Sequence, residues 1–156
     1  MTDFQTPDWV CDIMVGMIDD YPDSIIEPTP GEGNLVRALY NRFPKSNIIA
    51  LDDVYQYQPN KEIECACMNP PFSPMKQGFE ILKRVTEWTP YIIALLPWFM
   101  LINSERRTQW FIENGLCEII HLPRRAFPGS RVQTFIAKLI SGYKGEISFN
   151  TWEVRT

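Results

Sequence analysis

The chain has 156 residues, a formal net charge of −4 and a hydrophobic content of 45%. This length allows one domain with a single core, and the acidic balance argues against a protein that coats nucleic acid by bulk charge, although a local basic face is compatible with it. The four cysteines and the lone histidine lack zinc-binding spacing, and no apolar run has the length of a membrane span or the position of a secretory signal. We therefore expect a cytoplasmic protein with no metal site and no membrane partner.

The first half of the chain alternates helices and strands. Thr6 and Pro7 provide a helix cap followed by a proline suited to the first turn, and apolar residues continue at helical spacing as far as Ile18. The elements predicted next are a strand at 24–27, a glycine-rich turn at 28–33, a helix at 35–43, a strand at 47–51 and a polar loop at 55–61.

The second half repeats this alternation. Its predicted elements are a strand at 63–68, a helix at 77–88, a strand at 91–96, a helix from Ser104 to Gly115, and strands at 117–122 and 132–140 joined by a basic loop. This order predicts an α/β fold whose mostly parallel sheet has helices on both faces. We expect one domain over 1–156, with a core at about 4–140 and a C-terminal extension over 141–156 that can add an edge strand.

Four strand ends carry residues that point to a common site. Glu27, Asp52, Asn69 and Pro97 each stand at the carboxyl end of a predicted strand. Ligands of parallel α/β sheets bind at this edge. We therefore expect these four residues to lie along one side of the sheet.

Asn69 begins the sequence Asn-Pro-Pro-Phe, which suits a planar amino group as substrate. The Asn69 amide oxygen and the Pro70 carbonyl can accept the two amine hydrogens, because the two prolines stiffen the backbone and aim its carbonyls outward. The ring of Phe72 can stack on a flat base. This combination predicts methyl transfer to a planar amine.

The glycine-rich turn predicts a cofactor site. Gly31 and Gly33 let a ligand approach the backbone, and an acid at the end of the second strand can hold a ribose, a role for which Asp52 and Asp53 compete. A carboxylate at Glu27 would repel a pyrophosphate but can accept hydrogen bonds from an ammonium group. This favours S-adenosylmethionine over a dinucleotide as the cofactor.

Taken in order, these motifs resemble those of class I S-adenosylmethionine-dependent N6-adenine DNA methyltransferases of the gamma type, in which the cofactor motif precedes the catalytic one. The resemblance covers about residues 4–139. It rests on five motifs, which are Phe4-Gln5-Thr6-Pro7, residues 27–34, Asn69–Phe72, Leu96–Phe99 and Phe127–Val132. It implies a Rossmann-like fold with an antiparallel C-terminal strand.

The resemblance also implies a role for each residue of the predicted site. The cofactor-binding residues would be Phe4, Thr6, Pro7, Glu27, Pro28, Gly31, Gly33, Asp52 and Asp53. The catalytic residues would be Asn69, Pro70, Pro71 and Phe72. DNA would be the partner, with Phe127 stacking on a flipped-out or single-stranded adenine and Arg124, Arg125 and Arg131 contacting phosphates.

Two features depart from the family pattern. The connection at 53–63 is too short for the helix and strand that the fold usually inserts there, which predicts an incomplete or differently built pocket for the cofactor's adenine. Only a short segment follows residue 140 in this sequence, so we expect no separate target-recognition domain of the kind that many relatives have, and a homodimer or a separate specificity partner is an open expectation.

Alternative functions fit the same motifs. The planar amine could equally be a cytosine N4 amine, an RNA guanine or a glutamine amide in a protein. A non-catalytic binding module that retains the fold is the alternative from a different class.

Overall fold

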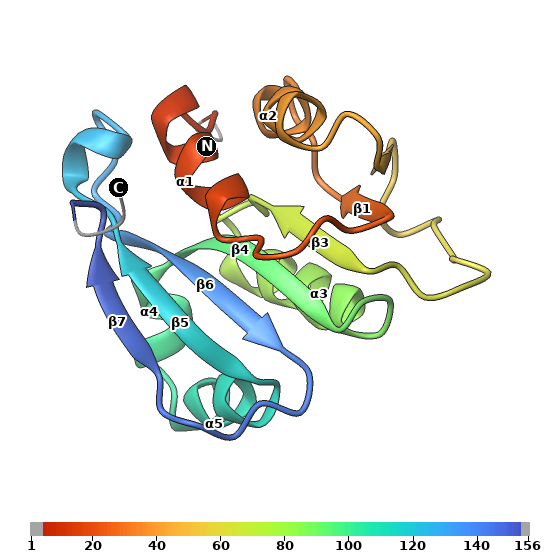
Figure 1. Cartoon of the computed structure of the whole chain (residues 1–156). Coiled ribbons are helices and arrows are strands. Elements are labelled where there is room, and N and C mark those ends of the chain that lie inside the picture. The colour runs from red at the N-terminus through yellow and green to blue at the C-terminus, as the bar shows by residue number, and fades with distance from the viewer. Residues whose placement is uncertain (1–4, 154–156) are drawn as a thin grey trace.

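The computed structural model describes residues 5–153, and in this range seven strands form one mixed sheet with helices on both faces (Figure 1). The strands are β1 (Ser24–Glu27), β2 (Asn47–Ala50), β3 (Cys65–Met68), β4 (Tyr91–Pro97), β5 (Leu116–His121), β6 (Thr134–Ile140) and β7 (Ser148–Thr151). Their order across the sheet is β2-β1-β3-β4-β6-β5-β7. The first four are parallel, β6 is antiparallel to β4 and β5, and β7 runs parallel to β5 at the edge. The predicted fold class is confirmed.

The helices form two layers that cover the sheet. They are α1 (Asp8–Gly16), α2 (Asn34–Arg42), α3 (Met75–Thr86), α4 (Trp98–Ile102), α5 (Glu105–Glu113) and a short 3-10 helix η1 (Arg124–Ala126). One core cluster contains residues of α1 and α2, and the other contains residues of α3, α4 and α5. Alternate residues of β4 enter the two clusters, with Ile93 in the first and Ile92 in the second, because successive side chains of a strand point to opposite faces.

Helix ends follow the local sequence in one case and tertiary contacts in another. The Ser104 hydroxyl accepts a hydrogen bond from the Arg107 N–H at 3.2 Å, so the predicted cap of α5 is confirmed. The predicted cap at Thr6 is wrong, since α1 begins at Asp8 after Pro7 and has no side-chain cap. The Thr6 hydroxyl is instead bonded to a residue far along the chain.

The connection between β2 and β3 contains neither a helix nor a strand, in agreement with its short length. Val54 and Ile63 are nevertheless buried in the core beneath it. The Ile63 N–H also donates to the Trp88 carbonyl at 2.9 Å, which ties the segment to the end of α3. The chain therefore crosses directly from β2 to β3 while remaining packed against the second helical layer.

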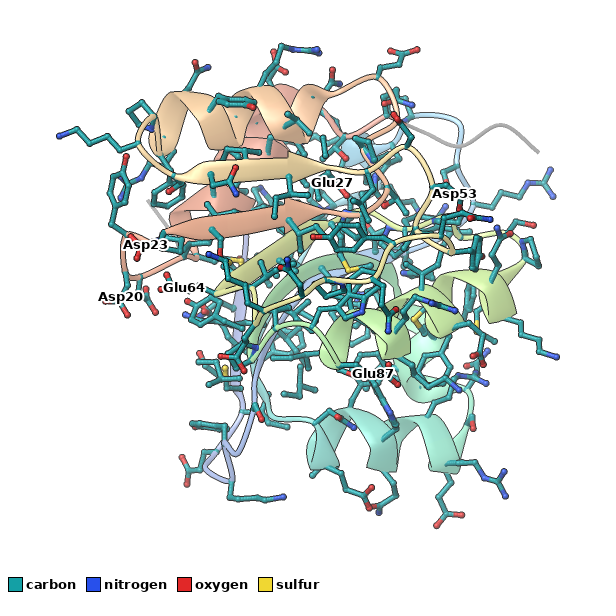
Figure 2. All side chains as sticks on the ribbon, turned by 90° about the vertical axis from the view of Figure 1, so that its right-hand side faces the viewer. Asp20, Asp23, Glu27, Asp53, Glu64 and Glu87 are labelled. Atoms are coloured by element: carbon teal, nitrogen blue, oxygen red, sulfur yellow. The ribbon has the colours of Figure 1, made fainter. Side chains whose placement is uncertain are left out.

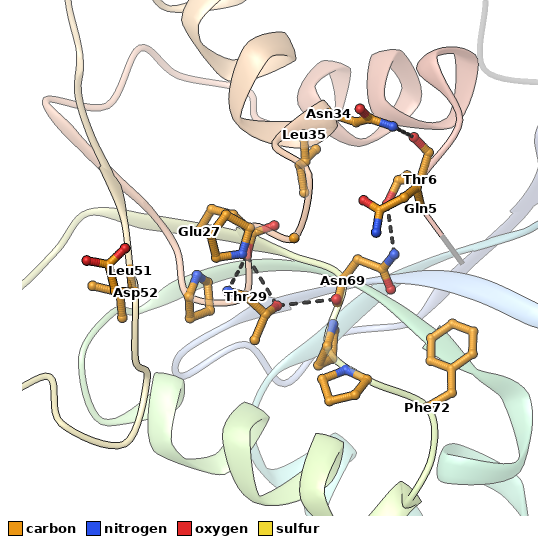
Figure 3. A pocket seen from close by; sticks show the side chains of 15 residues that line it. Gln5, Thr6, Glu27, Thr29, Asn34, Leu35, Leu51, Asp52, Asn69 and Phe72 are labelled. Carbon is orange, nitrogen blue, oxygen red and sulfur yellow. Dashed lines mark hydrogen bonds between the residues drawn. The ribbon is translucent and has the colours of Figure 1, made fainter. Parts of the chain in front are cut away.

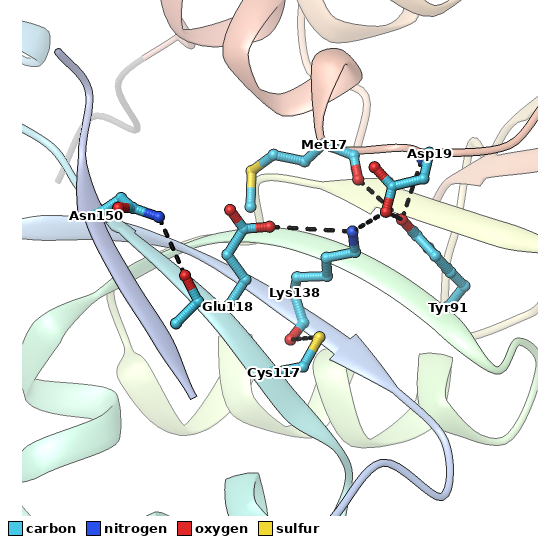
Figure 4. Close-up of polar contacts among 8 residues, drawn as sticks. Met17, Asp19, Tyr91, Cys117, Glu118, Lys138 and Asn150 are labelled. Carbon is cyan, nitrogen blue, oxygen red and sulfur yellow. Dashed lines mark hydrogen bonds and ion pairs between the residues drawn. The ribbon is translucent and has the colours of Figure 1, made fainter. Parts of the chain in front are cut away.

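An ion-pair network anchors the end of α1 to the sheet (Figure 4). The buried Lys138 ammonium on β6 donates to the Asp19 carboxylate at 2.5 Å, and the Glu118 carboxylate on β5 lies 4.0 Å away. The Tyr91 hydroxyl on β4 donates to the Met17 carbonyl at 2.8 Å. A buried charge requires such partners to remain ionised. The network thus fixes the position at which α1 leaves the sheet.

Candidate active site

A cavity of about 460 Å³ opens at the carboxyl ends of β1, β2 and β3. It is lined by Gln5, Thr6, Glu27, Pro28, Thr29, Pro30, Gly31, Asn34, Leu35, Leu51, Asp52, Asn69, Pro70, Pro71 and Phe72 (Figure 3). Three of the four strand-end residues expected along one side of the sheet, Glu27, Asp52 and Asn69, line this cavity. The fourth, Pro97, ends β4 and is not part of the lining.

The glycine-rich turn brings backbone to the wall of this cavity. Gly31 lines it with a φ of +54°, and Gly33 caps α2 with a φ of +89°, values that favour glycine. The Gln5 side chain contacts this turn. Its amide oxygen accepts a hydrogen bond from the Glu32 N–H at 3.2 Å. The N-terminal segment and the turn therefore form one wall together.

Glu27 is a buried carboxylic acid at the end of β1, with 1% of its surface exposed. In Figure 2 it lies inside the molecule, whereas the other labelled acidic residues are exposed at the surface. Its Oε1 accepts a hydrogen bond from the Thr29 N–H at 2.7 Å, and it lies 3.3 Å from the Thr29 hydroxyl oxygen, whose single hydrogen also has the Asn69 carbonyl within reach. Burial raises the pKa of Glu27 to about 8, and the hydrogen bonds from Thr29 and the Asn69 backbone oppose that rise. The site therefore holds an acid that an incoming cation would ionise.

The two candidate ribose acids at the end of β2 have different surroundings. Asp52 lines the cavity and is exposed to solvent. Asp53 lies outside the lining, and its Oδ1 accepts a hydrogen bond from the Tyr55 N–H at 2.9 Å. The structure therefore favours Asp52 as the acid available to a ligand, and Asp53 as a turn residue.

Asn69 is held at both its side chain and its backbone. Its Nδ2 donates to the Thr6 hydroxyl oxygen at 2.8 Å, and its carbonyl accepts from the Thr29 hydroxyl at 3.2 Å. Figure 3 shows the Asn69 amide oxygen on the side turned toward Phe72. The arrangement leaves one strong acceptor, Oδ1, at the boundary between the cavity and an aromatic ring.

The two aromatic residues of the predicted base site are buried and contact each other. Phe72 lines the cavity with 8% of its surface exposed. Phe127, expected to stack on a base, is 4% exposed and packs edge-on against Phe72 at 6.4 Å between ring centroids. The stacking of Phe127 on a base stays a prediction, and in the described structure Phe127 packs beside the ring that borders the cavity. Its ring supports Phe72.

The three predicted phosphate-contacting arginines lie on the loop beside this aromatic pair. Arg124 and Arg131 are exposed. The Arg125 guanidinium is also exposed but lies over the Trp9 ring at 4.8 Å from its centroid and within 6.0 Å of the Trp152 centroid. Arg125 is therefore fixed by aromatic contacts that the other two arginines do not show.

Not all of the remaining predicted site residues line the cavity. Phe4 lies outside the described residues. Pro7 and Gly33 are helix-terminal residues of α1 and α2 and lie outside the lining. Sequence reasoning did not assign the lining residues Gln5, Thr29, Pro30, Asn34, Leu35 and Leu51 to the site. Four of these belong to the quoted motifs. The motifs therefore identified the segments that line the cavity more accurately than they identified the individual lining residues.

Gly78 on α3 permits a close approach to the loop that carries Asn69. A Cβ added at Gly78 would lie 2.3 Å from the Pro71 carbonyl oxygen, a separation that real Cβ atoms do not adopt. Helix and loop therefore pack backbone against backbone.

Gly78→Ala is accordingly expected to lower the free energy of unfolding by about 1–3 kcal/mol, because the added methyl forces the loop and α3 apart. Urea denaturation would measure the change. Gly16→Ala on α1 is the matched control, since a Cβ there meets no atom within 4 Å. A helical glycine replaced without a clash should give a change of at most about 1 kcal/mol in the stabilising direction. Equal stability changes in the two variants would contradict the close contact.

Metal-binding clusters and membrane-spanning helices are both absent from the described part of the chain. Among residues 5–153 no group of three or more His, Cys, Asp or Glu side chains is arranged to hold a metal ion. Over the same range no helix has the length and apolar character needed to cross a bilayer.

No protein-family model matches this sequence, and no curated protein gives a significant match. Solved structures do resemble it. One, described as a class I S-adenosylmethionine-dependent methyltransferase from Listeria monocytogenes, is 15% identical and superposes with a TM-score of 0.72 over 94% of this chain and 65% of its own. Another, described as a modification subunit of a type I restriction enzyme from Vibrio vulnificus YJ016, is 14% identical with a TM-score of 0.72 over 96% and 47%.

A third structure is a type I restriction-modification system methyltransferase subunit from Streptococcus thermophilus, at 17% identity and a TM-score of 0.67 over 89% of this chain and 45% of its own. The chain thus spans less than two thirds of the length of each of these three proteins. At these identities the likeness shows the fold. The chain has the fold of the class I S-adenosylmethionine-dependent methyltransferases.

Proposed function

We propose that this protein is an S-adenosylmethionine-dependent methyltransferase that methylates the N6 amine of adenine in DNA, with the gamma order of motifs. The observation that carries the proposal is the meeting of Glu27, Asp52 and Asn69 around one cavity of about 460 Å³. This volume lies within the range of about 300–1,000 Å³ typical of small-molecule sites.

The residues around the cavity fit the proposed cofactor. Glu27 supplies a buried acceptor for an ammonium group, and Asp52 supplies an exposed carboxylate for a ribose diol. Leu35 and Leu51 contribute apolar lining. Bound S-adenosylmethionine would supply a methyl group made electrophilic by its sulfonium.

The remaining catalytic work belongs to the loop after β3. Oδ1 of Asn69 accepts one hydrogen of the adenine amine, and the Pro70 carbonyl accepts the other, which keeps the amine nitrogen directed into the cavity. Phe72 borders the base, and its edge-on contact with Phe127 holds its ring in place. Positioning of this kind can supply on the order of 7–11 kcal/mol of the barrier reduction.

Radiolabelled methyl transfer from S-adenosylmethionine to DNA, followed by nucleoside analysis, tests the proposal directly. The expected product is N6-methyladenosine in its deoxy form, obtained most rapidly from single-stranded or mismatched adenine, because such a base costs less to extrude. Label recovered in cytosine, in RNA guanine or in protein glutamine would assign the same loop to a different planar amine. Failure to label DNA of any sequence would show that DNA is not the substrate.

A non-catalytic binding module with this fold is separated from an enzyme by cofactor binding. An occupied cavity stabilises the folded state by about 2.7 kcal/mol when the ligand is present at a hundred times its dissociation constant. A shift in Tm with S-adenosylmethionine or its demethylated product supports the enzyme. Identical melting curves at high ligand concentration would favour the binding module.

We predict that Arg124 and Arg131 contact phosphates of the DNA. The double variant Arg124→Gln and Arg131→Gln should reduce the slope of log Kd against log salt concentration by about 0.9 for each duplex phosphate that an arginine no longer neutralises. Fluorescence anisotropy over a salt series measures this slope. Arg106→Gln, which removes an exposed charge from α5, is the control and should leave the slope unchanged. The same change in slope per removed arginine in both variants would indicate bulk charge rather than a specific contact.

A further inference from the structure

We propose that Thr6 is a positioning residue, whose hydroxyl orients the Asn69 amide so that its oxygen meets the substrate amine. This inference rests on the proposed function and deepens it, because the family resemblance placed Thr6 among the cofactor-binding residues. The contact that assigns the new role joins Thr6 to Asn69, 63 residues further along the chain.

The hydrogen bond lies in a setting where it has little competition from water. Thr6 is 4% exposed, and the Asn69 Nδ2 donates to its hydroxyl oxygen at 2.8 Å. A buried amide N–H that loses its acceptor is left with the full cost of its desolvation. The Asn69 side chain is therefore strongly biased toward the rotamer that keeps this contact.

Thr6 is itself fixed by neighbours from both helices of the first layer. Its carbonyl accepts a hydrogen bond from the Asn34 Nδ2 at 2.9 Å, and the Cys11 thiol lies 3.7 Å from the same oxygen. Asn34 is the first residue of α2, and Cys11 is buried on α1. The hydroxyl is thus presented from a rigid frame, which a positioning residue requires.

The backbone of Asn69 is held independently. The Thr29 hydroxyl donates to the Asn69 carbonyl at 3.2 Å from the glycine-rich turn (Figure 3). With the backbone fixed by Thr29, rotation of the side chain is the remaining freedom, and Thr6 removes it.

The direction of the amide decides whether the site attracts or repels an amine. A planar amide has an acceptor on one side and a two-hydrogen donor on the other. With Nδ2 bound to Thr6, Oδ1 faces Phe72 and can accept from an amine (Figure 3). If the amide turned over, an NH₂ group would face the substrate's own NH₂ group, and no hydrogen bond could form.

The first test compares Thr6→Val, Thr6→Ser and Thr89→Val. Valine matches threonine in shape but cannot accept the hydrogen bond, so Thr6→Val should lower kcat about tenfold and change the cofactor Kd by less than about twofold. Thr6→Ser should restore kcat to near the wild-type value. Thr89→Val is the matched control, because Thr89 is also 4% exposed and hydrogen-bonded but precedes β4 at the opposite edge of the sheet. A cofactor Kd that rises with kcat unchanged would overturn the inference in favour of cofactor binding.

The second test is a double-mutant cycle with Asn69→Ala. If Thr6 acts through Asn69, Thr6→Val should cost less than about twofold in kcat once the Asn69 side chain is gone, because interacting residues are not additive. A full tenfold loss in the Asn69→Ala background would show that Thr6 acts on the reaction by another route.

The third test needs no ligand and no activity. In ¹⁵N–¹H spectra the side-chain amide pair that disappears in Asn69→Ala belongs to Asn69. Its hydrogen-bonded proton should move upfield in Thr6→Val and stay in place in Thr6→Ser. If the chemical shifts of this amide pair do not change in Thr6→Val, the Asn69 amide has the reverse orientation, with Oδ1 accepting from the Thr6 hydroxyl. That result would contradict the inference. If the spectra respond as expected while the wild-type protein methylates no substrate, the proposed function fails and the contact stands.

Discussion

Asn69→Ala is expected to lower kcat for adenine methylation by about two to three orders of magnitude, while the cofactor Kd stays within a few fold of the wild-type value. Removing one preorganised hydrogen-bonding group at a reacting centre typically costs about 3–4 kcal/mol. Asn69 qualifies as preorganised because Thr6 and Thr29 hold its side chain and its carbonyl. Single-turnover transfer of a labelled methyl group measures the chemical step apart from product release.

The matched control is Asn41→Ala, an exposed residue of α2 that is not part of the cavity lining, so that the same kind of side chain is removed outside the site. It should methylate at the wild-type rate. A kcat for Asn69→Ala within about threefold of wild type would contradict direct acceptance of an amine hydrogen by this amide, since such an acceptor contributes far more. Circular dichroism and urea unfolding of both variants confirm that a loss of activity is not a loss of fold.

The location of the site was predictable because it depends on where strands end. The ends of β1, β2 and β3 are set by local apolar runs, and parallel strands bring their carboxyl ends to one edge. Glu27, Asp52 and Asn69 could therefore be placed together without knowledge of any contact between them. Pro97 shows the limit of this argument, because β4 lies one strand further along and its end falls outside the lining.

Features that depend on tertiary contacts were not predictable in this way. Thr6 has the sequence signature of a helix cap, yet its hydroxyl serves Asn69, and the spacing of 63 residues carries no local signal. The burial of Phe127 and its contact with Phe72 join two segments that are far apart in the sequence. In the sequence Gly78 is only a glycine in a predicted helix, and its close contact with the Pro71 carbonyl is visible only in the structure.

Short elements also carry too little local signal to be predicted from the sequence. Residues 98–102 follow the end of β4 and were assigned to no predicted helix or strand, but they form α4 after Pro97. Five residues are too few for helical periodicity to be recognised. The choice between Asp52 and Asp53 stayed open in the sequence, because adjacent residues at a strand end differ only in the direction in which the backbone aims them.

The affinity for S-adenosylmethionine is expected to rise about fiftyfold between pH 6 and pH 8. Burial raises the pKa of Glu27 to about 8 from an ordinary value of 4.5. If only the ionised carboxylate pairs with the ammonium, the competent fraction grows from about 1% at pH 6 to about half at pH 8, and the apparent Kd falls in proportion. The free energy of unfolding of the ligand-free protein changes in the opposite direction. Above pH 4.5 the unfolded chain releases a proton that the folded state retains, so the stability of the folded state falls as the pH rises toward 8.

Isothermal titration calorimetry at several pH values, in buffers of different ionisation enthalpy, measures both the affinity and the protons released. Near pH 6 binding should release about one proton, since the ammonium draws Glu27 into its charged form. Glu27→Gln should bind more weakly at pH 8 and lose this proton release, whereas titration of the ligand's own amine is common to both proteins and cancels in the comparison. Asp52→Asn, on the other side of the cavity from Phe72 in Figure 3, should weaken binding and keep the pH slope. The same slope in Glu27→Gln as in the wild type would show that the buried acid does not receive the ammonium, and the orientation of the cofactor in the cavity would have to be reversed.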